Sequence, residues 1–226
     1  MKKISLILAI MCSVLFLASA CGAEKTETDA TSQTYFADLD HDGTDERIKI
    51  YRDTYQYIAE VYDREELLWS EFAADAHPGW KALFLCQNED GDYLLRYSPT
   101  MYQGVCTYGY QLFTLEDGQE QIADQDQVEF DINFGSPLHD QFEPAAIASL
   151  VETVNTYLAE SKALLVTDPN LLNTFEKNGM LKDDLWFLDT EENGFIRDSS
   201  ASLEENLIAY AACQSDSTNP TLPKQG

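Results

Sequence analysis

The sequence predicts an α+β fold, in which an antiparallel β-meander sheet is followed by helices that pack on one of its faces. Two observations support this prediction. Between Tyr35 and Phe134, apolar residues recur with a period of two, and turn signals separate the runs. After Pro144 the period changes to that of an amphipathic helix. Short links between successive strands favour antiparallel pairing, and the chain is long enough for one domain with a substantial core.

Residues 1–20 have the features of a secretory signal peptide. Lys2 and Lys3 precede an apolar run that is too short to span a bilayer. The small residues Ala18-Ser19-Ala20 then come directly before Cys21, as in bacterial lipoprotein signals. Cys21 is therefore the predicted lipidation site, which would hold the protein at the extracytoplasmic face of the cell membrane. Ala18-Ser19-Ala20 also fits the A-x-A site of ordinary signal peptidase, and that reading predicts a secreted protein.

The rest of the chain divides by composition. Residues 21–34 are polar and lack periodicity, as expected for a flexible lipoprotein tether. A single domain is predicted over residues 35–214, with a β-rich part at 35–135 and a helical part at 140–214. Residues 215–226 are rich in Ser, Thr, Asn and Pro, which predicts a disordered tail.

The β-rich part contains several strand signals. Alternation is clearest at its end, where the residues predicted to face the core are Val128, Phe130, Ile132 and Phe134. Their neighbours Glu129 and Asp131 are predicted to face water. Earlier runs of the same character are Ile48–Ile50, Tyr57–Tyr62, Leu67–Phe72, Ala82–Gln87, Tyr93–Tyr97 and Val105–Leu115. Asp90-Gly91 and Asp117-Gly118 stand between such runs and predict hairpin turns, because these residues tolerate a positive φ.

Two helices are predicted in the second half. The apolar residues that share one helical face after Pro144 are Ile147, Leu150, Val151, Val154 and Leu158. Ser202-Leu203-Glu204-Glu205 has the pattern of a capping box and predicts a last helix that continues through Ala212. Residues 171–188 are ambiguous, and the interpretation is a short helix followed by a final strand around Leu185–Leu188.

Charge and cysteine content limit the classes of partner. With 40 acidic and 14 basic residues the net charge is −26, and loss of two lysines with the signal makes the mature chain more negative. Such a surface repels nucleic acid and anionic lipid head groups, and it suits a cation or a basic partner. Cys86, Cys106 and Cys213 fit no zinc spacing. Buried thiols are expected, although an oxidising compartment would permit a Cys86–Cys106 bridge.

One acidic segment, Asp38–Glu46, carries a pattern with defined chemistry. Calcium takes about six to eight hard oxygen ligands, and carboxylates at alternate positions of a tight loop can all turn inward. The predicted ligands are Asp38, Asp40, Asp42, the carbonyl of Thr44 and the carboxylate of Glu46. A structural role for the ion is expected, and His41 should point away from it. The alternative is an acidic turn in which Asp and Gly only shape the backbone.

The pattern D-x-D-x-D-G-x-x-E running into a strand resembles the calcium loops of FG-GAP repeats. Lys49 stands where an EF-hand needs a glutamate, so an EF-hand is excluded. The segment also resembles one near the start of small lipoproteins of Gram-positive gut bacteria that carry a single such loop. A looser similarity continues through Trp69, Tyr93–Tyr97, Asp184–Leu188 and Ser202–Leu207. The resemblance implies a location and an architecture, and it implies no activity.

The sequence favours a non-catalytic binding or accessory module. It contains no H-E-x-x-H, G-x-S-x-G, Walker or dinucleotide motif, and no residue is assigned a catalytic role. Tyr97, Tyr102 and Tyr108 with Arg96 form a candidate ligand surface, since tyrosine rings can stack on sugars or contact a peptide. Strand propensity alone also explains these tyrosines. The alternative function is an extracytoplasmic hydrolase that uses acidic residues on a carbohydrate or peptide, and no particular protein or glycan partner is indicated.

Overall fold

A computed structural model describes residues 32–54, 56–74, 81–159, 161–167, 185–188 and 195–217. The chain divides into two units, residues 1–30 and 31–226, and every described residue belongs to the second. Several predictions lie outside the described residues: the signal peptide, Cys21, most of the tether, residues 171–184 and the end of the tail. The described residues form ten strands, all antiparallel in their pairing, and two α-helices, which confirms the predicted α+β class.

The first four strands form a four-stranded meander in chain order. They are β1 (Gln33–Ala37), β2 (Glu46–Arg52), β3 (Gln56–Asp63) and β4 (Glu66–Ala74). β1 begins inside the segment predicted as tether. Alternate residues of these strands are buried on one face, among them Ile48, Ile50, Ala59, Val61 and Trp69. The period of two read from the sequence therefore corresponds to one covered face of this sheet.

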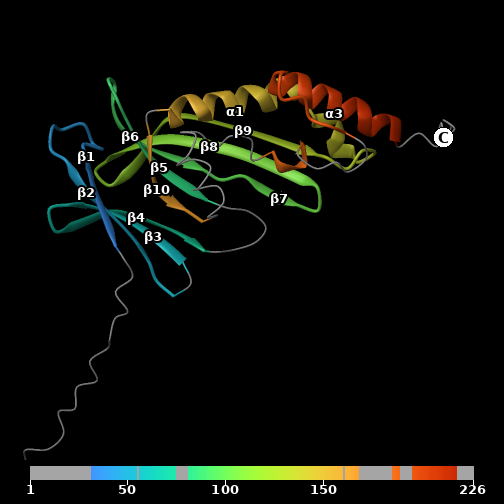
Figure 1. Cartoon of the computed structure of the whole chain (residues 1–226). Coiled ribbons are helices and arrows are strands. Elements are labelled where there is room, and N and C mark those ends of the chain that lie inside the picture. The colour runs from blue at the N-terminus through green and yellow to red at the C-terminus, as the bar shows by residue number, and fades with distance from the viewer. Residues whose placement is uncertain are drawn as a thin grey trace, which may run out of the picture. The chain divides into compact units, whose positions relative to one another are not determined.

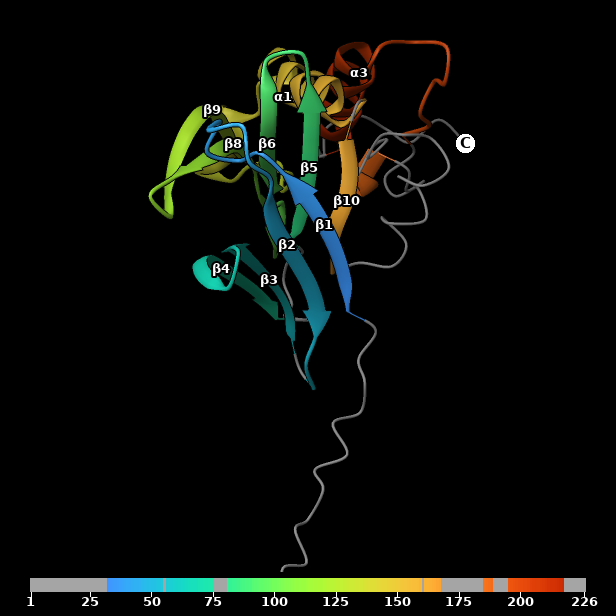
Figure 2. The ribbon, with the colours of Figure 1, turned by 90° about the vertical axis from the view of Figure 1, so that its left-hand side faces the viewer.

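The next strands form a separate six-stranded sheet. They are β5 (Ala82–Asn88), β6 (Gly91–Tyr97), β7 (Thr100–Tyr102), β8 (Val105–Glu116), β9 (Gln119–Asp131) and β10 (Ser161–Val166). The prediction of one continuous sheet is thus corrected to two sheets. β5 pairs with β6 on one side and with β10 on the other, so its backbone groups are not available to β4 (Figure 2). β10 lies within the part predicted to be helical.

The six-stranded sheet is the middle layer of the fold. Alternate residues of β5 point to two different cores: Leu83 and Leu85 pack with the four-stranded sheet, while Phe84 and Cys86 pack with the helices. Figure 1 shows α1 and α3 on one side of this sheet and β1–β4 on the other. Burial on both sides accounts for the uninterrupted apolar run at Ala82–Cys86. Cys86 and Cys106 are buried thiols, as expected.

The helices follow the sequence prediction closely. In α1 (Pro144–Leu158) the buried residues are the five predicted to share its apolar face. α3 (Leu203–Ser217) begins with the predicted capping box: the Ser202 N–H donates to Glu205 Oε2 (2.8 Å), and the Glu205 N–H donates to Ser202 Oγ (3.2 Å). The helix extends past Ala212 into the first residues of the predicted tail. Within the described residues, no helix combines the length and apolar character needed to cross a membrane.

Two predictions near the helices need correction. The expected strand at Leu185–Leu188 is instead the 3-10 helix η2 (Trp186–Leu188), which places Leu185, Phe187 and Leu188 in the helix-side core. Asp131, expected in water, is 4% exposed. Its carboxylate accepts a hydrogen bond from the Asn133 N–H (2.6 Å) and so orders the turn after β9. Burial alone would raise the Asp131 pKa, but hydrogen bonds from Ser136 and Asn133 hold it below its usual value.

Phe130 and Glu129 behave as predicted. Phe130 is fully buried against the helices, and Glu129 is exposed. Val128, Ile132 and Phe134 are only partly buried, although all three pack against the same core. The strand itself ends at Asp131, so Ile132 and Phe134 belong to the turn that leads into the 3-10 helix η1 (Pro137–Gln141).

Candidate functional site

The predicted calcium loop connects β1 to β2 and lies against the six-stranded sheet. The Asp38 N–H donates to Asp92 Oδ2 (3.0 Å), and the Leu115 N–H donates to the Leu39 carbonyl oxygen (3.0 Å). The Leu39 side chain is fully buried in the core between the sheets. The loop is therefore a point at which the two sheets are joined.

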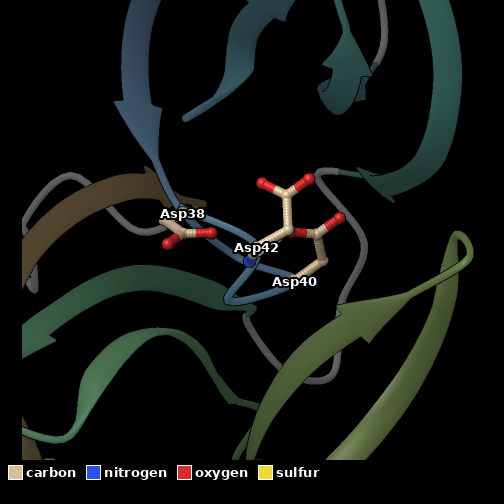
Figure 3. A group of neighbouring side chains, drawn as sticks. All are labelled: Asp38, Asp40 and Asp42. Carbon is tan, nitrogen blue, oxygen red and sulfur yellow. Dashed lines mark hydrogen bonds between the residues drawn. The ribbon is translucent and has the colours of Figure 1, made fainter. Parts of the chain in front are cut away.

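Three of the predicted ligands come together in this loop. One carboxylate oxygen from each of Asp38, Asp40 and Asp42 lies within 4.8 Å of the other two (Figure 3). Backbone N–H groups bind the same side chains: Gly43 donates to Asp38 Oδ2 (3.0 Å), and Thr44 donates to Asp42 Oδ1 (2.8 Å). These bonds fold the loop tightly and hold its carboxylates close together.

One carboxylate oxygen of Asp38 lacks a partner. Asp38 Oδ1 is buried and accepts no hydrogen bond within the described residues, whereas Asp38 Oδ2 is engaged by Gly43. A buried acceptor without a partner costs about 1–3 kcal/mol, and more when it is charged. The Gly43 backbone has φ +90°, and the space around the missing Cβ is empty, so this glycine is needed for its conformation and not for room.

Glu46, the predicted ligand at the ninth position, has a different place. It is 3% exposed, its Oε2 accepts the Leu39 N–H (2.7 Å), and it is not part of the group of three. Burial raises the pKa of the Glu46 carboxyl, and the charges of Asp40 and Asp38 raise it further, against the opposing effect of backbone hydrogen bonds from Leu39 and Asp40. Glu46 therefore fixes the loop from its buried side. Thr44 is exposed, and its carbonyl stays a predicted ligand.

His41 lies outside the carboxylate group, in line with the sequence interpretation. Its ring meets Tyr93 edge-on at 5.5 Å, and its Nε2 lies 3.2 Å from the Asp92 carbonyl oxygen. A Cβ at Gly91 would come within 2.7 Å of this Nε2, so glycine at the start of β6 allows the imidazole to rest on the β5–β6 hairpin.

The candidate tyrosine surface does not form. Tyr97 and Tyr108 are 2% and 3% exposed and belong to the helix-side core, where Tyr108 stacks on Phe130 with ring centroids 5.8 Å apart. Tyr102 is exposed on β7. The side-chain alternation of β6 turns Arg96 away from Tyr97, toward the other face of the sheet. The strand-propensity explanation of these tyrosines is the one that the burial supports.

Arg96 instead joins the two sheets. Its guanidinium donates to Glu71 Oε2 on β4 (2.7 Å), to Glu120 Oε1 on β9 (2.7 Å) and to Gln111 Oε1 (2.6 Å). It also lies 4.6 Å from the centre of the Phe113 ring. Burial would lower the Arg96 pKa, but the hydrogen bonds and charges of Glu120 and Glu71 raise it above its usual value. The positive charge of Arg96 is therefore paired with the carboxylates of Glu71 and Glu120 within the protein.

A second feature, which the sequence interpretation missed, is a polar groove on β6, β8 and β9. Its volume is about 540 Å³, and the residues that line it are Arg96, Ser98, Thr107, Gly109, Tyr110, Gln111, Gln125, Asp126 and Gln127. Its one acidic lining residue is Asp126, whereas glycoside hydrolysis generally uses a pair of carboxyl groups. The groove thus gives no support to the hydrolase alternative. A glycine in the middle of a predicted strand, Gly109, was the signal that could have indicated it.

The chain was compared with protein-family models, with curated proteins and with solved structures, and nothing matches.

Proposed function

We propose that the protein is a membrane-anchored extracytoplasmic lipoprotein that serves as a binding or accessory module and uses calcium to brace its acidic loop. The observation that supports the calcium site is the buried Asp38 Oδ1, which has no partner and belongs to a carboxylate that groups with those of Asp40 and Asp42. Hard oxygen atoms of this kind are the ligands that calcium prefers. A cation there would satisfy the buried oxygen and relieve the repulsion between the carboxylates.

The role of the ion is structural. The backbone of the loop is hydrogen-bonded to β6 and β8 residues of the six-stranded sheet, through Asp38 and Leu39. Ordering the loop would therefore strengthen the junction between the two sheets. The three aspartates supply part of a calcium shell, and water together with the Thr44 carbonyl would complete it.

The anchor is supported by the sequence alone. Cys21 follows the small residues Ala18-Ser19-Ala20, and β1 begins at Gln33. The segment from Cys21 to Gln33 reaches at most about 40 Å when fully extended. A lipid on Cys21 would thus keep the domain close to the membrane surface.

Thermal unfolding tests the calcium site. The mature chain carrying Cys21→Ser, which cannot be lipidated, is melted in calcium, in magnesium and in a chelator. Calcium should stabilise the fold by about 2.7 kcal/mol at a concentration of about one hundred times its Kd, and magnesium should do less. Asp40→Asn should remove most of the calcium response. The matched control is Asp45→Asn, which removes an exposed carboxylate of the same loop that lies outside the cluster.

Two results would count against the calcium site. One is a single melting temperature for the wild-type chain in calcium and in chelator. The other is an equal loss of response in Asp45→Asn, which would indicate general charge screening.

The anchor is tested separately, by mass spectrometry of the mature N-terminus after expression in a bacterium that processes lipoproteins. We expect a lipid-modified Cys21 in the membrane fraction, and Cys21→Ser should release the protein or stall its processing. An unmodified Cys21 in a freely secreted product would overturn the proposal.

A further inference from the structure

The outer face of the four-stranded sheet, which points away from the six-stranded sheet, carries exposed apolar side chains. Strands β1–β4 form the layer opposite the helices, and their inward residues belong to the core between the sheets (Figure 1). Outward residues include Phe36, Leu67 and Phe72, which are 58%, 50% and 65% exposed. The other exposed large apolar residues of the described chain are spread over β7, β9, α3 and the segment before α3. Apolar exposure is therefore concentrated on this face.

The strand register places aromatic and basic side chains beside these apolar residues. Residues paired across a ladder share a face, and two rows cross the outer face from strand to strand. The first row is Phe36, Arg47, Tyr62 and Leu67, and the second row is Tyr51, Ile58 and Phe72. The row between them contains Lys49 and Glu60. The outer face thus combines apolar, aromatic and cationic groups on one surface.

The two cations of the outer face are paired with aromatic rings. Within the described residues, neither Arg47 nor Lys49 forms an ion pair with a carboxylate. The Arg47 guanidinium lies 4.5 Å from the centre of the Tyr62 ring, and the Lys49 ammonium lies 4.6 Å from the centre of the Tyr51 ring. Glu60 accepts hydrogen bonds from the hydroxyls of Tyr51 (3.0 Å) and Tyr62 (2.8 Å). Both positive charges are therefore available to an anionic partner, although the chain as a whole is strongly acidic.

We propose that the outer face docks on the surface of the lipid bilayer. Apolar and aromatic side chains mixed with Lys and Arg are typical of protein surfaces that rest among lipid head groups, where the rings enter the interface and the cations meet phosphates. The inference rests on the proposed anchor at Cys21. The chain from Cys21 to Gln33 reaches at most about 40 Å, and Gln33 begins β1 of this same sheet. Such a short tether gives the face a high effective concentration at the bilayer, so weak docking is sufficient.

Charge complementarity selects this face over the rest of the surface. The net charge of −26 would repel an anionic bilayer if acidic residues met it. At physiological salt, interactions between exposed charges are screened beyond about 8 Å, so the residues in contact with the lipid decide the outcome. A second copy of the chain fits this face less well. Two such faces would bring Arg47 and Lys49 together with their own counterparts, and each copy carries the same large negative charge.

The test uses tryptophan reporters and vesicles of phosphatidylcholine and phosphatidylglycerol that contain a nickel-chelating lipid. The mature chain carrying Cys21→Ser is held on them by an N-terminal histidine tag, which makes the result independent of natural lipidation. Phe72→Trp places a reporter on the outer face, and Ile208→Trp is the matched control on α3, since Ile208 is also an exposed apolar residue at 52%. Brominated acyl chains should quench the Phe72→Trp fluorescence, relative to vesicles without bromine. Ile208→Trp should behave as the wild type does.

A charge variant tests the cations. Arg47→Gln with Lys49→Gln, made in the Phe72→Trp chain, should lower the ratio of docked to undocked protein by about tenfold or more, because each basic residue near an anionic surface contributes a several-fold gain in binding. Lys162→Gln removes an exposed cation of β10 outside the outer face and should change the quenching little. Circular dichroism checks that every variant is folded.

Four results would overturn docking on the bilayer. They are no quenching of Phe72→Trp, equal quenching of Ile208→Trp, quenching that the charge variant leaves unchanged, and a dimer in vesicle-free sedimentation that Phe36→Ser separates. The last result would assign the face to a second copy of the chain. Mass spectrometry that finds an unmodified Cys21 would instead remove the natural anchor and leave this readout unchanged, so the two failures are distinguishable.

Discussion

Carboxylate side chains of β9 have different kinds of partner on the two faces of the six-stranded sheet. On the helix side, Asp124 Oδ2 accepts hydrogen bonds from the neutral hydroxyls of Tyr110 (2.7 Å) and Tyr157 (2.6 Å). On the other side, Glu120 is bound by the cationic Arg96 and by the indole N–H of Trp69. Each carboxylate thus has partners, but the first ties a helix to the sheet and the second ties two sheets together.

The difference shows that the layer packed against a strand face decides whether the residues of that face are buried. Strand β8 alternates in the same way along its whole length, yet its residues have three environments. Tyr108 and Tyr110 lie under the helices, Phe113 and Leu115 lie under the four-stranded sheet, and Gly109 lies in the open groove. Alternation assigns residues to faces, and the neighbouring layers then decide whether a face is buried in a core or stays open to solvent.

The largest contrast between the faces should come from Phe130→Ala. Phe130 is fully buried and contacts the rings of Tyr108, Phe142 and Phe187. Its truncation should cost about 3–5 kcal/mol of unfolding free energy, because the cavity cannot close fully. Glu129→Ala, one residue earlier on the exposed side, should cost little. Chemical denaturation of both variants measures this, and equal stabilities would contradict the assignment of the faces.

The junction between the sheets should be the next most sensitive place. Arg96→Met keeps an apolar side chain but leaves Glu71 with Lys81 alone and Glu120 with Trp69 alone. Removing one partner of a largely buried ion pair should cost about 3 kcal/mol. Lys81→Met is the matched control, because Lys81 is 42% exposed and such a pair contributes at most about 1 kcal/mol. A larger loss of unfolding free energy in the Lys81 variant, again measured by denaturation, would mean that Arg96 is not the main contributor to stability at the junction of the two sheets.

The helix-side carboxylate should show a smaller effect that depends on pH. The hydrogen bonds from Tyr157 and Tyr110 lower the pKa of Asp124, so the stability they contribute is present at neutral pH and is lost as the pH falls through that pKa. Tyr157→Phe should cost about 1.5–3 kcal/mol at neutral pH, as expected for a hydrogen bond to a charged group. The gap between wild type and variant should narrow in acid. A gap that is constant across the pH range would show that Tyr157 acts by packing alone.

Local patterns predicted local structure well. The five apolar residues on one face of α1, the capping box at Ser202 and Glu205, and the hairpin at Asp117-Gly118 are all confirmed. Each of these depends on residues close together in the chain, where a helical or turn conformation is decided by nearby side chains.

Features that depend on distant partners were not predicted. β10 is a strand because β5 provides its ladder, and nothing inside Ser161–Val166 specifies that partner. In the acidic loop the spacing indicated three of the carboxylates that gather, but Glu46 turned inward to bind the Leu39 N–H. The groove lies where the four-stranded sheet does not cover the six-stranded sheet (Figure 1). The periodicity of a sequence does not indicate which part of a sheet face is covered.

The smallest effects should come from Gly118 and Gly109, which differ in whether the backbone conformation and the surrounding space require glycine. Gly118 has φ +73°, and an added Cβ would lie 2.7 Å from the Leu68 carbonyl oxygen, so Gly118→Ala should destabilise by more than about 1 kcal/mol. Gly109 has neither constraint, so Gly109→Ala should stabilise the fold by about 0.5–1 kcal/mol, since alanine loses less backbone entropy. Melting both variants measures the contrast. A stabilising Gly109→Ala would show that the fold tolerates a side chain at this position; a loss as large as that of Gly118→Ala would show that packing requires the glycine.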